Sequence, residues 1–217
     1  MPFIVPLRSV VVMLLLFAAA YFPAFALSGG LHLPPDRMVP TVMGVSFTVA
    51  AALMAFAIWR GWFTTVDFGL RWPAPRDLLL ACGLGIPASA LIAWGMSHAH
   101  EPGPLGGLTL TPWQVYLCFA VGAPIQEETI FRGLLQSTLA KSLTGAPAIA
   151  AVSAIAASVL VAALFGAVHL VVGPWTALAA LVLGVFAGEL RRRSGSLLPA
   201  IVCHAIFNLG GMVWPAH

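Results

Sequence analysis

Long apolar runs, separated by short polar joints rich in proline and glycine, organise this chain. Each run continues for about the 20 residues that an α-helix needs to cross a bilayer. None shows the alternating short strands of a transmembrane barrel. The pattern predicts an all-α, polytopic transmembrane helical bundle, a single membrane domain over residues 1–217, with about seven (six to eight) spans. The expected spans are 7–27, 41–59, 77–97, 112–140, 146–171, 175–190 and 196–214.

Composition supports lipid as the main solvent. Hydrophobic residues make up 60% of the chain and charged residues 8%, whereas a soluble domain carries roughly 25% charged residues. The net charge of +3 comes from basic residues that are not interleaved with aromatic ones, so the sequence predicts no nucleic-acid partner. The three cysteines have the spacing of neither a disulfide framework nor a zinc knuckle.

The distribution of basic residues predicts the topology. Lysine and arginine concentrate on cytoplasmic loops, and a cytoplasmic N-terminus in the cell membrane leaves only Arg37 outside and Arg132 within a span. The others then lie on the cytoplasmic side: Arg8, Arg60, Arg71, Arg76, Lys141, Arg191, Arg192 and Arg193. The first run also resembles a cleavable signal peptide that ends in Ala24-Phe25-Ala26. We favour an uncleaved helix because further spans follow it.

The fourth span contains charged residues. Placing one such side chain at the centre of a bilayer costs about 2.5–3.5 kcal/mol, so a lipid-facing helix would exclude them. Glu128 and Arg132 are four residues apart, so they share a helix face and are predicted to pair. Glu127 points about 100° away and is left without a cation on its own helix. Pro124 lacks a backbone N–H, so we expect the helix to bend or restart near it. A restart would place Glu127 in a first turn, where the helix dipole favours its ionised form.

Two later spans carry further polar residues. His169 follows Phe165 by four residues, and Asn208 follows His204 by four, so each pair lies on one helix face. A glutamate and a histidine can together hold and deprotonate a water. A second histidine and an asparagine can donate hydrogen bonds to a developing oxyanion. This set is suited to attack of water on a peptide carbonyl.

Other hydrolytic chemistries are less well supported. The serines lack the strand–turn–helix setting of a nucleophile elbow, and there is no His-Glu-x-x-His helix. A divalent metal such as zinc, held by Glu127, His169 and His204, remains possible at this stage.

The three motifs, in order and spacing, resemble those of the CPBP intramembrane proteases, also called the CAAX-protease and bacteriocin-processing or Abi family. The matching residues are Glu127-Glu128-x-x-x-Arg132, Phe165-x-x-x-His169 and His204-x-x-x-Asn208, within residues 121–211. The family includes the type II CAAX prenyl endopeptidases and is often labelled metalloprotease. The resemblance implies a glutamate-dependent endopeptidase for membrane-associated peptides or lipidated, CaaX-type protein tails.

The resemblance also implies roles for single residues. Glu127 with His169 would activate the water, and Glu128 would support the site by pairing with Arg132. His204 and Asn208 would stabilise the oxyanion. Two alternatives remain: a non-enzymatic membrane protein, such as a bacteriocin immunity factor or scaffold, and a proton-coupled transporter. The helical rise places His169 near the outer end of its span, so we expect either a 171–175 turn sunk in the protein or a 141–153 segment outside the membrane.

Overall fold

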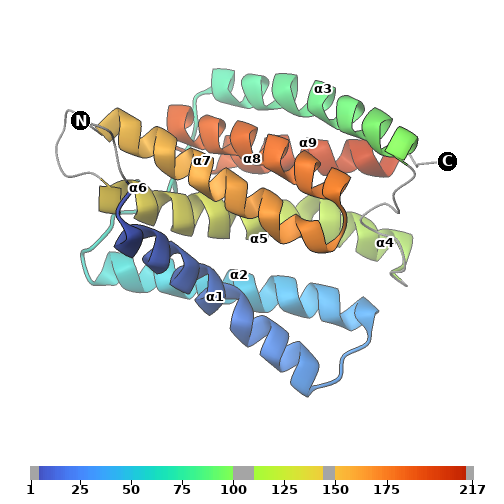
Figure 1. Cartoon of the computed structure of the whole chain (residues 1–217), viewed down its shortest axis with the longest axis horizontal. Coiled ribbons are helices and arrows are strands. Elements are labelled where there is room, and N and C mark those ends of the chain that lie inside the picture. Colours follow the sequence, from blue (N-terminus) through green and yellow to red (C-terminus); the bar gives the residue numbers. More distant parts are fainter. Residues whose placement is uncertain (1–4, 100–109, 144–149, 214–217) are drawn as a thin grey trace.

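The computed structural model describes residues 5–99, 110–143 and 150–213. Over these ranges the chain is a bundle of roughly antiparallel helices without strands (Figure 1). The long helices are α1 (Leu7–Gly30), α2 (Pro35–Trp59), α3 (Pro75–Ala99), α7 (Ala150–Val168), α8 (Pro174–Ser194) and α9 (Leu198–Val213). Between α3 and α7 one helical segment consists of α4 (Pro112–Val115), η1 (Tyr116–Gly122), α5 (Ala123–Glu128), η2 (Thr129–Gln136) and α6 (Ser137–Leu143).

The all-α, polytopic prediction is confirmed. Five helices within the described ranges are long and apolar enough to cross a membrane: Leu7–Gly30, Pro35–Trp59, Pro75–Gly95, Ala150–Val171 and Pro174–Ser194. A sixth apolar helix, Leu198–Gly210, is shorter. The helical segment from α4 to α6, which carries Glu127 and Glu128, lies centrally in the bundle. Its residues from Thr129 to Gln136 are all buried. Two predicted boundaries, at 146 and 214, lie outside the described residues.

The fourth segment does not break at Pro124. Residues Tyr116–Gly122 form a π-helix, and an α-helical hydrogen-bond pattern begins at Ala123 with Pro124 in its first positions. Gly122 keeps helical angles of φ −65° and ψ −52°. The register of the helix therefore changes where a restart was predicted, but the chain stays helical. Glu127 is not in a first turn, so the predicted stabilisation by a helix dipole is wrong.

The structure also contradicts one of the two alternatives predicted for His169, a 171–175 turn sunk in the protein. A short 3₁₀ helix, η4 (His169–Val171), follows α7, and Leu170 and Val171 are 61% and 90% exposed. This turn is therefore not sunk in the protein. The residues just before α7 (Ala150–Val168) lie outside the described ranges, so the other alternative, a 141–153 segment outside the membrane, stays a prediction.

Small residues bring α7 and α8 into close contact. A Cβ at Gly166 would lie 2.9 Å from the Cβ of Leu181, and one at Gly184 would lie 3.1 Å from the Cα of Ala162. Small residues at such interfaces let membrane helices approach until their backbones touch. We expect Gly166→Val to lower the stability of the folded state by about 1–3 kcal/mol, the usual range for overpacking.

Thermal unfolding in detergent tests the Gly166→Val prediction. Gly83→Val is the matched control, because a Cβ at Gly83 meets no atom within 4 Å. Equal melting temperatures for the two variants would show that the α7–α8 contact tolerates the added methyl groups.

The connection between α2 and α3 is fixed by a local carboxylate. The backbone N–H of Thr64 donates to Oδ2 of Asp67 at 2.7 Å, and this bond lowers the pKa of Asp67 below its usual value, with smaller contributions from the Thr64 side chain and Lys141. A depressed pKa in the folded state means that the bond stabilises the turn at neutral pH and is lost as pH falls through that pKa. The protection of the Asp67, Phe68 and Gly69 amides, measured as exchange relative to an unstructured chain at the same pH, should therefore fall at acid pH, and Asp67→Asn should remove this pH dependence of the protection.

Basic and aromatic side chains gather at one end of the bundle. The starts of α1 and α3 and the ends of α2, α6 and α8 lie at this end (Figure 1), and they carry the basic residues predicted to be cytoplasmic. Trp59, Trp62 and Trp72 are here too, and are 76%, 54% and 85% exposed. Exposed tryptophans of this kind are typical of a membrane–water interface.

Candidate active site

Glu128 and Arg132 form a fully buried ion pair, as the sequence predicted. Arg132 Nη1 lies 3.2 Å from Glu128 Oε1, and both side chains are 0% exposed. Arg132 Nη2 also donates to the carbonyl of Gly184 on α8 at 3.0 Å. This bond was not predicted, because a backbone carbonyl leaves no trace in the sequence. The pair therefore fixes η2 against α8 as well as holding the Glu128 carboxylate.

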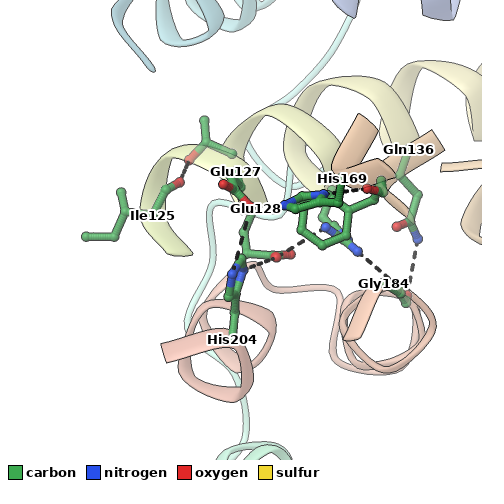
Figure 2. Close-up of polar contacts among 11 residues, drawn as sticks. Ile125, Glu127, Glu128, Gln136, His169, Gly184 and His204 are labelled. Carbon is green, nitrogen blue, oxygen red and sulfur yellow. Dashed lines mark hydrogen bonds and ion pairs between the residues drawn. The ribbon is translucent and has the colours of Figure 1, made fainter. Parts of the chain in front are cut away.

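His204 bridges the two glutamates (Figure 2). Its Nδ1 lies 2.8 Å from Glu128 Oε1, and its Nε2 lies 3.8 Å from Glu127 Oε2. Since Glu128 is already paired with Arg132, its carboxylate accepts from the imidazole, and Nδ1 carries a proton. The orientation of the ring is thereby fixed, with Nε2 directed to the Glu127 side.

Glu127 is the more accessible of the two carboxylates. Its side chain is 19% exposed, against 0% for Glu128. No arginine or lysine pairs with Glu127 within the described ranges, which agrees with its predicted place off the Glu128–Arg132 face. The 3.8 Å separation from His204 is too long for a hydrogen bond, so both groups retain hydrogen-bonding capacity for a third molecule.

The phenyl ring of Phe165 packs against the rings of both His169 and His204. Its side chain is 1% exposed, and its ring centroid lies 4.7 Å from that of His169 and 5.9 Å from that of His204. The guanidinium of Arg132 also lies over it, at 4.7 Å. Residues of all three predicted motifs therefore meet at one phenylalanine. Glu127 and His169 themselves share no hydrogen bond within the described part of the chain.

The orientation of His169 follows from the four-residue spacing. Its Nδ1 lies 2.7 Å from the carbonyl oxygen of Phe165, one turn earlier on α7. A carbonyl only accepts, so Nδ1 donates and a neutral His169 has its lone pair on Nε2. The Phe-x-x-x-His motif thus fixes a histidine with a basic outer nitrogen.

Asn208 is bound to the helix that carries Glu127. Its Nδ2 donates to the carbonyl of Phe119 at 2.7 Å. The N–H of Ala123 donates to Cys118, five residues back, so the next bond of this π pattern would join Pro124 to Phe119. Pro124 has no N–H. The Phe119 carbonyl is therefore left free, and Asn208 satisfies it.

A second polar contact, which the sequence analysis missed, links the N-terminal helices to the site. Gln126 Nε2 donates to the hydroxyl of Tyr21 on α1 at 2.9 Å and to that of Ser46 on α2 at 3.0 Å. Because Gln126 precedes Glu127, these bonds hold the glutamate's stretch of helix against α1 and α2. The presence of a tyrosine and a serine in otherwise apolar helices was the feature of the sequence that could have indicated this contact.

The expected metal ligands do not converge on one point. Among the described residues, no three histidine, cysteine or acidic side chains are placed to hold a metal ion. The trio Glu127, His169 and His204 therefore does not fit a metal site.

Comparisons with known proteins agree with the resemblance drawn from the motifs. Residues 109–210 match the family described as type II CAAX prenyl endopeptidase Rce1-like. The matched segment begins just before α4 and ends in α9, so it contains Glu127, Glu128, Arg132, His169, His204 and Asn208. Neither the curated proteins nor the solved structures include a match to the chain.

Proposed function

The segment of residues 109–210 belongs to the Rce1-like, type II CAAX prenyl endopeptidase family, and on this premise we propose that the protein is a glutamate-dependent intramembrane endopeptidase. The observation that supports this most directly is the Glu127 carboxylate, which is 19% exposed, has no arginine or lysine partner among the described residues, and lies 3.8 Å from an imidazole whose other nitrogen is fixed by Glu128. Glu127 is thus a carboxylate with free acceptor capacity beside a positioned histidine.

Water activation falls to Glu127 and His169. Glu127 holds the water through its carboxylate, and the basic Nε2 of His169 is available to take a proton. The water oxygen then attacks the scissile carbonyl carbon. The proton moves on to the leaving amine, so the peptide bond breaks into a carboxylate and an amine.

Stabilisation of the oxyanion falls to His204 and Asn208. Glu128 holds the Nδ1–H of His204, so Nε2 is the ring nitrogen on the Glu127 side, and a proton there can be donated to the oxyanion. Asn208 uses one amide proton on Phe119 and has a second for the same oxygen.

The substrate class follows from where the site lies. Glu127 lies in the central helical segment, among helices long and apolar enough to cross a membrane, so a peptide that is itself associated with the membrane suits this position. We propose membrane-associated peptides or lipidated, CaaX-type protein tails as substrates. The basic residues at one end of the bundle support a multi-pass cell-membrane protein with a cytoplasmic N-terminus.

A cleavage assay tests the proposal. The purified chain in detergent is incubated with a farnesylated CaaX-type peptide and a panel of signal-like peptides, and the products are identified by mass. We expect cleavage at a single bond that persists after chelation and is lost in His169→Ala. The matched control His32→Ala, which replaces a histidine at the α1–α2 turn, should retain cleavage. No cleavage of any peptide, or equal activity in both variants, would reject the proposed enzyme.

A further inference from the structure

A cavity of about 350 Å³ opens at the basic end of the bundle, away from the candidate active site. It lies among the α2–α3 connection, the end of the fourth segment, the start of α7 and the end of α8. The lining residues are Phe63, Asp67, Gln136, Ser137, Ala140, Lys141, Ala150, Ala154, Arg191 and Arg192. None of them belongs to the candidate active site, so what the cavity binds is independent of the proposed function.

The lining carries an excess of positive charge. Three cations line the cavity and Asp67 is the single carboxylate among the lining residues. Lys141 lies 3.8 Å from Asp67 and also donates to the Trp62 carbonyl. Arg191 donates to neutral oxygens, the backbone carbonyl of Asp67 at 2.7 Å and the Ser137 hydroxyl at 3.2 Å. Arg192 shares Glu189 with Arg193. An anion would balance the remaining charge.

Gln136 adds an acceptor that needs a donor. Its residue is 5% exposed, and its Nε2 donates to the Gly188 carbonyl at 3.2 Å, which fixes the amide orientation. The Oε1 is buried and has no hydrogen-bond partner in the described protein. A buried acceptor left without a donor costs about 1–3 kcal/mol. Gln136 lines the cavity, and a small movement of its side chain on ligand binding would bring this oxygen within reach of a donor, so a ligand with a hydroxyl group beside its anionic group would satisfy both features.

The depth of the cavity relative to the membrane–water interface indicates which kind of molecule would supply such a ligand. Its Lys141 bonds to Trp62, and Trp62 belongs to the exposed tryptophans at this end of the bundle. Aromatic belts mark the depth of lipid headgroups, and basic pockets between helices bind anionic headgroups. We propose that this cavity binds the phosphodiester headgroup of an anionic, hydroxyl-bearing phospholipid such as phosphatidylglycerol. The phosphate meets Arg191, Arg192 and Lys141, and the headgroup hydroxyl donates to Gln136 Oε1.

Thermal unfolding of the full chain in neutral detergent tests the proposal, with short-chain phosphatidylglycerol, matched phosphatidylcholine or inorganic phosphate added. We expect phosphatidylglycerol alone to raise the unfolding temperature. Arg192→Gln should weaken its apparent affinity about tenfold, and Gln136→Met should weaken it as well. Arg193→Gln is the matched control, because it removes the same charge and another bond to Glu189 but does not line the cavity.

The outcomes separate the alternatives. An equal loss in Arg192→Gln and Arg193→Gln would mean surface attraction to lipid, not a site. Equal stabilisation by inorganic phosphate would assign the cavity to a free anion, and no effect of any addition would mean that it holds water. Each of these results overturns the proposal. If Arg192→Gln does not fold, Lys141→Gln and Gln136→Met carry the same comparison.

Discussion

Replacing Glu127 by glutamine should lower the rate of peptide cleavage by at least a hundredfold while leaving the fold intact. The amide keeps the size of the side chain but cannot hold and polarise the water as the carboxylate does, and positioned acid–base groups contribute typically 10²–10⁴-fold. Within the described residues no arginine or lysine pairs with Glu127, so its replacement should cost little stability. The measurement is kcat at saturating peptide together with the unfolding temperature in the same detergent.

Glu189→Gln is the control for this variant. It makes the same chemical change at a carboxylate that pairs with Arg192 and Arg193 at the end of α8. Its cleavage rate should remain within about twofold of the original. If Glu127→Gln cleaves as fast as Glu189→Gln, Glu127 takes no part in activating the water.

Arg132→Met should produce the largest loss of stability. It removes the only arginine bonded to Glu128 in the described structure and the donor to Gly184, and it leaves a fully buried carboxylate with His204 as its remaining partner. Removing one member of a buried pair typically costs about 3–5 kcal/mol. Thermal or denaturant unfolding should show this loss, with cleavage lost in proportion to the folded fraction.

The double variant Glu128→Gln/Arg132→Met separates charge burial from packing. Removing both charges eliminates the unpaired carboxylate, so the double variant should be more stable than Arg132→Met alone. Coupling between contacting residues of this kind is usually 0.5–3 kcal/mol. A double variant no more stable than the single one would mean that Arg132 acts through its packing on Phe165 instead.

The sequence predicted the helices well because lipid imposes a simple rule. A backbone inside a bilayer must satisfy its own hydrogen bonds, so a long apolar run without the alternation of barrel strands, such as residues 41–59, is predicted as a helix. The same rule did not reveal the π-helical register of Tyr116–Gly122. That register leaves the Phe119 carbonyl for Asn208 to satisfy, and a contact between segments 89 residues apart is invisible in local pattern.

The candidate site was predicted in part, for a physical reason that differs between residues. Helical spacing sufficed for Glu128–Arg132, because both partners lie on one helix. It did not predict that His204 would bridge Glu128 and Glu127, since that depends on how α9 packs against α5. The contact of Tyr21 and Ser46 with Gln126 was missed for the same reason.

A structure of Glu127→Gln with an uncleaved substrate peptide tests the central claim most directly. The distances to measure run from the scissile carbonyl to the four candidate catalytic side chains. We expect its oxygen within about 3 Å of His204 Nε2 and Asn208 Nδ2, with its carbon facing a water between residue 127 and His169. A peptide bound with its carbonyl away from these groups would contradict the account.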